Sequence, residues 1–300
     1  MFSIGHLSDL HTTAVRPEHP GQLASKRFFG WLSWRLRRRH VYRPHVLDAL
    51  IEDLRDLAPN EVVVTGDLTN VALESEFDAA HVLLQRIGAP ERVFVVPGNH
   101  DAYVPIERER SWKKWSAYMA SDAPTPGEEF PTLRRRGPVA IVGMCSATPT
   151  PLFTAGGTVG PEQCARLERM LREQGDAGLC RIVLIHHPIC ENATSQRRSL
   201  SDAAAVRAVL ARAGAELVLH GHNHRTQILE VPGPDAPIPV VGVRSASYVG
   251  RKRHKLAHYH VYGVEPGPTD GSGPRFRLTL RTRAFDPDSG RFLAGGERAL

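Results

Sequence analysis

The stretch Arg92–Asp101, RVFVVPGNHD, decides the fold of this chain. Its first five residues, Arg92–Val96, are β-branched or aromatic apart from the arginine, and they predict a buried strand. Pro97 and Gly98 then end the strand, because neither residue continues a regular ladder. Asn, His and Asp follow at once, so the strand delivers chemically active side chains directly to a loop.

Strands and helices alternate on both sides of this stretch up to residue 225, after which strands follow one another across Gly and Pro loops. This order predicts a layered α/β domain with mixed sheets. The predicted strands are Phe2–Leu7, Glu61–Thr65, Arg92–Val96, Val139–Met144, Ile182–Ile185, Glu216–Leu219, Thr226–Val231, Pro239–Val243, His258–Val264 and Arg275–Arg283. The predicted helices are His45–Leu57, Leu73–Ile87, Glu107–Ala120, Pro161–Gln174 and Asp202–Ala213.

The composition is that of an ordinary globular protein. Of the 300 residues, 41% are hydrophobic and 23% charged, which excludes wholesale disorder, collagen and coiled coil. The 4 cysteines are scattered without a CxxC pair, which favours a reducing compartment over a disulfide framework. The first residues lack the features of a secretory signal, so we expect a cytoplasmic protein. The net charge of +6 fits an anionic partner such as a phosphate ester, a nucleic acid or an acidic lipid, without choosing among them.

Five of the predicted strands end in a loop that carries Asp, Asn or His. Ligands of α/β sheets bind beyond the carboxyl ends of the strands, so one site can collect all five loops. Oxygen and imidazole donors without cysteine suit Mn, Fe, Zn or Co. These donors are too many for one catalytic metal, which takes about three protein ligands, but they suit two metals that share a bridge. They are Asp9, His11, Asp67, Asn99, His186, His222 and His224.

The motif blocks that carry these donors resemble the calcineurin-like metallophosphoesterase superfamily. D-x-H, G-D, G-N-H-D, H-x-P and G-H-x-H occur in the order typical of that family, over about the first 250 residues. The resemblance implies a four-layer α/β/β/α sandwich with two mixed β-sheets. We expect a single domain over residues 1–285 and a C-terminal tail over 286–300. The implied activity is hydrolysis of a phosphodiester or related phosphate ester, by in-line attack of a hydroxide that bridges two metal ions.

The resemblance also implies how the two metals are held. One metal would be bound by Asp9, His11 and His224, the other by Asn99, His186 and His222, with Asp67 as the bridge. In the pair His186 and His187, the resemblance favours the first, although either ring could reach a metal. The complete donor set argues against the alternative of a non-catalytic binding module with a vestigial metal site.

Two further residues carry implied catalytic roles. His100 would contact the substrate phosphate or protonate the leaving oxygen. Asp101 would orient His100 or tune it electrostatically.

Residues 17–44 form an insertion between the first two motif blocks. Its segment 26–40, KRFFGWLSWRLRRRH, is basic and aromatic and has no acidic residue. The segment fits a helix lying on an anionic membrane or a helix packed on the core, and nucleic-acid contact is the least favoured interpretation. Candidate substrate contacts are Trp31, Trp34 and Arg225.

The insertion bears on the choice of substrate. In composition it is similar to the insertion of enzymes that cleave UDP-2,3-diacylglucosamine in lipid A synthesis, and such an activity at the membrane surface is the alternative function. The class III cyclic-nucleotide phosphodiesterases of the superfamily share the G-N-H-D and H-H-P blocks seen here. The expected partner is therefore a small phosphorylated substrate, either a cyclic nucleotide or a nucleotide-lipid.

Overall fold

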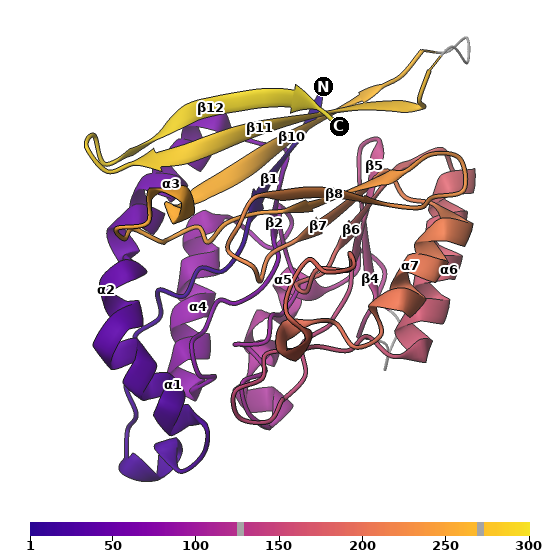
Figure 1. Ribbon diagram of the computed structural model, residues 1–300. Helices are drawn as coiled ribbons and strands as arrows, with labels where there is room; N and C mark the ends of the chain where they lie inside the picture. Colours follow the sequence, from indigo (N-terminus) through magenta and orange to yellow (C-terminus); the bar gives the residue numbers. More distant parts are fainter. Residues whose placement is uncertain (125–128, 269–272) are drawn as a thin grey trace.

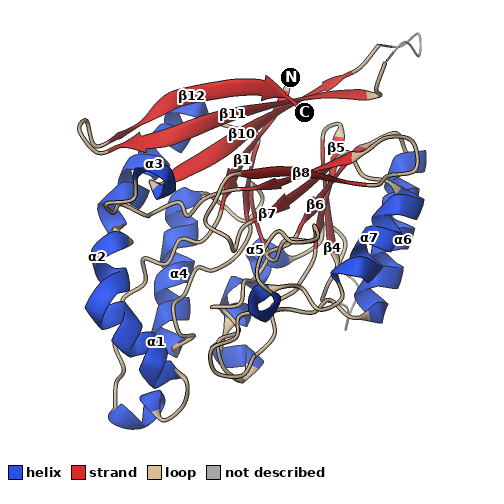
Figure 2. Cartoon of the chain, in the orientation of Figure 1, coloured by secondary structure: helices blue, strands red, loops and turns tan. Residues whose placement is uncertain are grey.

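Two mixed β-sheets lie face to face, and helices cover their outer faces (Figures 1 and 2). This computed structural model describes residues 1–124, 129–268 and 273–300. The first sheet has the strand order β12-β11-β10-β1-β2-β3 and the second the order β4-β5-β6-β7-β9-β8. The layers follow the expected four-layer α/β/β/α sandwich.

Parallel pairing within each sheet brings the carboxyl ends of the central strands to one edge. In the first sheet β1, β2 and β3 are parallel, and β10, β11 and β12 extend it antiparallel. In the second sheet β5, β6, β7 and β9 are parallel, with β4 and β8 antiparallel at the edges. The strands are β1 Phe2–Leu7, β2 Glu61–Val64, β3 Val93–Val95, β4 Thr132–Arg136, β5 Val139–Gly143, β6 Cys180–Leu184, β7 Leu217–His220, β8 Gln227–Val231, β9 Ile238–Gly242, β10 His258–Pro266, β11 Phe276–Asp286 and β12 Arg291–Ala299.

Alternation along the strands supplies both faces of each sheet with apolar side chains. On β2, Val63 joins the core between the sheets, whereas Val62 and Val64 join the core under the helices. Amphipathic helices α3 and α4 cover the first sheet, and α6 and α7 cover the second. The longer helices are α3 Pro44–Leu57, α4 Glu74–Ile87, α6 Pro161–Asp176 and α7 Ala203–Ala213. The short 3-10 turns η1, η5 and η6 are Pro20–Leu23, Gln196–Arg198 and Arg253–Lys255.

The insertion forms a helical segment over residues 27–41, composed of α1 Arg27–Ser33, the π-helical turn η2 Trp34–Arg38 and α2 Arg39–Val41. Its inner face packs on the body of the protein through Trp31 and Trp34. Its outer face leaves Phe28, Phe29 and Leu36 exposed. No helix among the described residues is long and apolar enough to cross a membrane.

Three segments differ from the sequence prediction. Residues 286–300, expected as a tail, contain β12, which pairs with β11 as the edge strand of the first sheet. The strand β4 was not predicted, because its sequence TLRRR is mostly basic. In place of one helix over Glu107–Ala120, the chain forms the short turns η3 Arg108–Arg110, η4 Trp112–Trp115 and α5 Ser116–Met119. The backbone of Ser111, with φ −122° and ψ −139°, interrupts the helical path.

One buried arginine connects the edge strand β4 to the rest of the fold. The guanidinium of Arg134 is almost fully buried and lies 3.8 Å from the buried Glu61 carboxylate. It donates hydrogen bonds of 2.6 to 3.0 Å to the carbonyl oxygens of Pro90, Val93, Ala117 and Ala120.

We expect Arg134→Met to lower the free energy of unfolding by about 3–5 kcal/mol, because it leaves several carbonyl groups and Glu61 buried with fewer partners. Urea unfolding of the variant and the wild type measures the difference. Arg277→Met, at an exposed position of β11, is the control and should change little. Equal stability of the Arg134 variant and the wild type would contradict this role.

Candidate dinuclear metal centre

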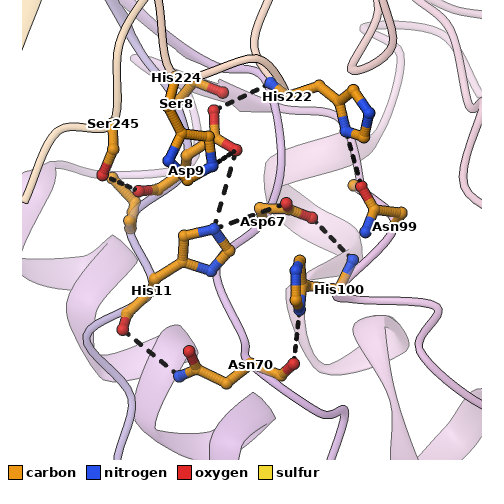
Figure 3. Close-up of polar contacts among 12 residues, drawn as sticks. Ser8, Asp9, His11, Asp67, Asn70, Asn99, His100, His222, His224 and Ser245 are labelled. Atoms are coloured by element: carbon orange, nitrogen blue, oxygen red, sulfur yellow. Dashed lines mark hydrogen bonds and ion pairs between the residues drawn. The ribbon is translucent and has the colours of Figure 1, made fainter. Parts of the chain in front are cut away.

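The seven predicted donors meet where the two sheets present the carboxyl ends of their parallel strands. Figure 3 labels all of them except His186. The loops that follow β1, β2 and β3 carry Asp9, His11, Asp67 and Asn99, and those that follow β6 and β7 carry His186, His222 and His224. All seven are buried except His224, which is half-buried. Residues separated by more than 200 positions in the sequence therefore form one cluster.

One group of donors surrounds the carboxylate of Asp9. Its Oδ1 lies 3.1 Å from Nε2 of His224 and 3.8 Å from Nε2 of His11. Nε2 of His11 lies 3.6 Å from Oδ2 of Asp67. Ligand atoms of Asp9, His11 and His224 all lie within 4.8 Å of one another, a spacing that one metal ion can span.

The other group surrounds Asn99. Its Oδ1 lies 3.1 Å from Nε2 of His186 and 2.9 Å from Nδ1 of His222. Oδ2 of Asp67 lies 3.4 Å from Nε2 of His186, so the same carboxylate oxygen faces both groups. This is the position that a bridging ligand needs.

Hydrogen bonds fix which ring nitrogen of the histidines faces the centre. Nδ1 of His11 is 3.1 Å from the Thr69 carbonyl, and Nδ1 of His186 is 2.6 Å from the Thr65 carbonyl. A carbonyl only accepts, so each Nδ1 carries the proton and each Nε2 offers its lone pair to the centre. Nδ1 of His224 contacts the hydroxyl of Tyr42 at 3.1 Å, and its Nε2 faces Asp9.

The structure distinguishes the two adjacent histidines. Both ring nitrogens of His187 have partners outside the centre, Nδ1 with the Ser146 hydroxyl at 2.8 Å and Nε2 with the Ala155 carbonyl at 3.2 Å. Nε2 of His186 instead faces Asp67 and Asn99. The geometry therefore favours His186 as the ligand.

The residues present fit a pair of divalent cations. Oδ1 of Asp9 and Nε2 of His11 are buried and have no hydrogen-bond partner among the described residues. Such atoms are costly unless something binds them, and a cation would satisfy both. Burial raises the pKa of Asp67, but nearby His186 and His100 outweigh it and hold that pKa well below the usual range. Asp67 is therefore a carboxylate, as metal binding requires.

The backbone is held in an unfavourable conformation at many of the donors. Asp9, His11, Asp67, His222 and His224 have φ between 47° and 68°, a region that residues other than glycine rarely adopt. The loops also approach closely, because a Cβ on Gly98 would lie 2.3 Å from Oδ1 of Asp67. Only glycine fits there.

Asp101 holds two of these loops together. Its carboxylate accepts hydrogen bonds of 2.9 to 3.0 Å from the backbone N–H groups of Asp67, Leu68, Thr69 and Gly98. It also accepts from the Thr69 hydroxyl at 3.1 Å. We expected Asp101 to orient His100 or to tune it electrostatically, and the structure directs its carboxylate to the backbone that carries Asp67. It thus acts on the site by positioning a loop.

His100 lies beside this bridge and is half-buried. Its backbone N–H donates to Oδ1 of Asp67 at 2.8 Å, and its Nδ1 donates to the Asn70 carbonyl at 2.6 Å. The ring stacks on Tyr103, with centroids 5.6 Å apart and an interplanar angle of 11°. Burial, followed by the charge of Arg38, lowers the pKa of His100 to about 4. The ring is therefore neutral at pH 7, with Nε2 as its remaining acceptor.

The predicted substrate contacts lie apart from the donors. Trp31 and Trp34 are half-buried against Val71 and Leu73, and Arg225 is exposed. Among the described residues, none of the three contacts a donor through a hydrogen bond or ion pair. The insertion instead reaches the site through Arg38 and Tyr42, which sequence reasoning missed. The signal was helical spacing, because Trp31, Trp34 and Arg38 fall on one helical face. Tyr42 follows directly after the end of α2.

Comparison with known proteins gives the family and the fold. The family model described as calcineurin-like phosphoesterase matches residues 2–226. A search of curated proteins finds no match. Among solved structures, a dimetal phosphatase from Danio rerio is similar at 13% identity and a TM-score of 0.64, over 98% of each chain.

Two larger proteins share the fold. A purple acid phosphatase from yellow lupin is similar at 12% identity and a TM-score of 0.58, over 99% of this chain and 53% of that one. The sulfate thiohydrolase SoxB of Thermus thermophilus is similar at 16% identity and a TM-score of 0.54, over 97% of this chain and 58% of the other. At these identities the likeness concerns the fold.

The positioning role of Asp101 predicts that Asp101→Asn weakens both metal binding and the fold. The amide group would face backbone N–H donors, and leaving them unpaired should cost about 2–4 kcal/mol in the free energy of unfolding. Urea unfolding and titration with Mn²⁺ measure the two effects.

Asp202→Asn is the matched control, because the Asp202 carboxylate also accepts from backbone N–H groups, those of Val159 and Gly160, but away from the donors. That variant should bind Mn²⁺ like the wild type. Wild-type Mn²⁺ affinity in Asp101→Asn would show that the site does not depend on this carboxylate.

Proposed function

The chain belongs to the calcineurin-like phosphoesterase family, whose members are hydrolases, and we propose that it hydrolyses a phosphodiester or related phosphate ester with two divalent metal ions. One observation carries the proposal: Oδ2 of Asp67 lies between His11 of one donor group and His186 of the other. A carboxylate shared by two sets of oxygen and imidazole donors is what a dinuclear centre requires. The donor types suit Mn, Fe, Zn or Co.

Each side chain has a part in this reaction. Asp9, His11 and His224 would hold one cation, and Asn99, His186 and His222 the other, with Asp67 shared. Cations held there would activate water for in-line attack and neutralise charge on the phosphate oxygens.

His100 would act at the edge of the centre. Because its Nδ1–H is committed to the Asn70 carbonyl, Nε2 is the ring atom left for the phosphate or the leaving oxygen. Asp101 keeps the Asp67 loop and the His100 loop in register.

Asp67→Ala tests the proposal most directly, because it removes a ligand from both cations at once. We expect the variant to bind less Mn²⁺ and to lose more than about 10³-fold in turnover of bis(p-nitrophenyl) phosphate. Elemental analysis and a steady-state assay with Mn²⁺ give the two values, and Arg277→Met should retain both. Full turnover with normal metal content in Asp67→Ala would refute the bridging role.

An exposed apolar cluster favours a second candidate, in which the substrate is a nucleotide-lipid at an anionic membrane. The rings of Phe28 and Phe29 lie 5.6 Å apart, and the ring of Phe153, from a distant loop, lies 5.9 Å from Phe29. Lys26 fixes the two segments to each other through a 2.6 Å hydrogen bond to the Thr150 carbonyl. These aromatic residues are 45%, 48% and 74% exposed.

The charges around this cluster complement an anionic surface. Arg35, Arg37 and Arg39 of the same helical segment are exposed. Apolar side chains beside clustered arginines are typical of surfaces that lie on anionic membranes. We infer a cytoplasmic protein that acts at the inner face of the membrane, a location that also fits its free cysteines.

The double variant Phe29→Ser and Phe153→Ser should bind vesicles of phosphatidylglycerol and phosphatidylcholine at least about tenfold more weakly than the wild type, because each phenyl ring would otherwise be buried in lipid. Co-sedimentation measures binding. Leu293→Ser, at an exposed apolar position of β12, is the matched control. The second candidate is wrong if the wild type does not bind these vesicles and hydrolyses 3′,5′-cyclic AMP in preference to UDP-2,3-diacylglucosamine. The enzyme would then act on soluble diesters.

A further inference from the structure

One face of the inserted helical segment leads from the core to the metal centre. Trp31 and Trp34 pack on the core, and Arg38 follows Trp34 by four residues, so it lies on the same face. The segment Trp34–Arg38 is a π-helical turn, a distortion found frequently at functional sites. The helix is therefore anchored at one end of this face and delivers an arginine at the other.

Arg38 contacts two residues that adjoin the candidate centre, His100 and Tyr42. Its Nη1 is 3.3 Å from both ring nitrogens of His100. Its guanidinium carbon is 5.3 Å from the centre of the Tyr42 ring, and the Tyr42 hydroxyl contacts His224. Arg38, His100, Tyr42 and the donor His224 are half-buried, whereas the other six donors are buried. Arg38 therefore lies among the residues of the candidate site that are in part accessible to solvent.

Among the described residues, the positive charge of Arg38 has no anionic partner. Within the described parts of the chain, no carboxylate lies at ion-pair distance from its guanidinium. Nδ1 of His100 already donates to Asn70, so only Nε2 can accept from Arg38, and most of the guanidinium N–H groups remain available. A cation beside two metal ions is repelled unless an anion lies between them.

We propose that Arg38 binds a phosphate oxygen of the substrate and so makes the inserted helix part of the substrate-binding site. A phosphate group carries the missing negative charge, and the planar guanidinium matches its oxygens in pairs. The inference rests on the phosphoesterase activity proposed above and adds a residue that none of the five motif blocks contains. It also gives the insertion a role in catalysis that is independent of any membrane contact.

The test compares two variants. Arg38→Met keeps the apolar part of the side chain, and Arg38→Lys keeps the positive charge but lacks the planar guanidinium group. The control is Arg277→Met, at an exposed position of β11 that belongs neither to the candidate centre nor to the insertion. Calorimetry of the Mn²⁺-loaded proteins measures the dissociation constant of inorganic phosphate. Steady-state kinetics on bis(p-nitrophenyl) phosphate gives kcat and KM, and elemental analysis gives the Mn²⁺ content.

We expect Arg38→Met to weaken phosphate binding and to lower kcat/KM by about 10–100-fold, the usual effect of losing a charged hydrogen bond. Arg38→Lys should fall between that variant and the wild type. Arg277→Met should match the wild type, and Mn²⁺ content should not change in any variant. Unchanged phosphate affinity in Arg38→Met, or a loss explained by lower Mn²⁺ content, would overturn the inference.

Two further outcomes are separable. If Arg38→Met does not fold, Arg38→Lys becomes the test of the proposal. Wild-type phosphate affinity and KM in Arg38→Lys would then contradict phosphate binding by the guanidinium group of Arg38. If the wild type binds phosphate in an Arg38-dependent way but hydrolyses none of the esters, the proposed function fails while phosphate binding by Arg38 is supported.

Discussion

The hydrogen bonds to the Asp101 carboxylate are the constraint on which the rest of the site depends. The loop after β2 and the loop after β3 each carry a donor, and neither loop has regular secondary structure to fix it. Asp101 supplies the missing acceptor for the N–H groups of Asp67, Leu68, Thr69 and Gly98. Burying a carboxylate is costly, and burial together with Asp67 raises the pKa of Asp101. The backbone hydrogen bonds offset that cost. Through them, the single side chain of Asp101 positions the loops that carry Asp67 and Asn99.

A second buried carboxylate extends the framework outward. Glu76 at the start of α4 accepts from the backbone N–H groups of Asn70, Val71 and Leu73 and from the Thr13 hydroxyl. It thus fixes the segment that follows the Asp67 loop. Arg27 of the insertion donates in turn to the carbonyl oxygens of Val71 and Ala72. The inserted helix is therefore positioned by the loop that carries Asp67. This explains how an insertion that contains none of the motif blocks is placed accurately beside the candidate centre.

The sequence predicts the parts of the structure that depend on local patterns. Runs of β-branched residues mark the central strands, and the polar blocks at their ends mark the seven donors, because the carboxyl ends of parallel strands must meet. The edge strand β4 escapes prediction because TLRRR has no apolar alternation, and its stability comes from the contacts of Arg134 with distant carbonyls. The contacts of Asp101 also escape prediction. Because Asp101 is adjacent to His100 in the sequence, the sequence suggests that the two side chains interact. In the structure, the Asp101 carboxylate instead accepts hydrogen bonds from a loop more than 30 residues earlier in the chain.

The insertion shows why composition alone cannot decide between packing and function. Its tryptophans were the conspicuous residues in the sequence, yet both face the core, where they hold the helix in place. The exposed rings are those of Phe28 and Phe29, and the residue that reaches the centre is Arg38, one of several arginines that look equivalent in the sequence. The difference between Arg38 and its neighbours Arg37 and Arg39 is helical phase, set by how the tryptophans pack. A single helix can therefore anchor itself through its aromatic side chains, expose apolar rings on its outer side, and place one guanidinium group beside His100 at the candidate centre.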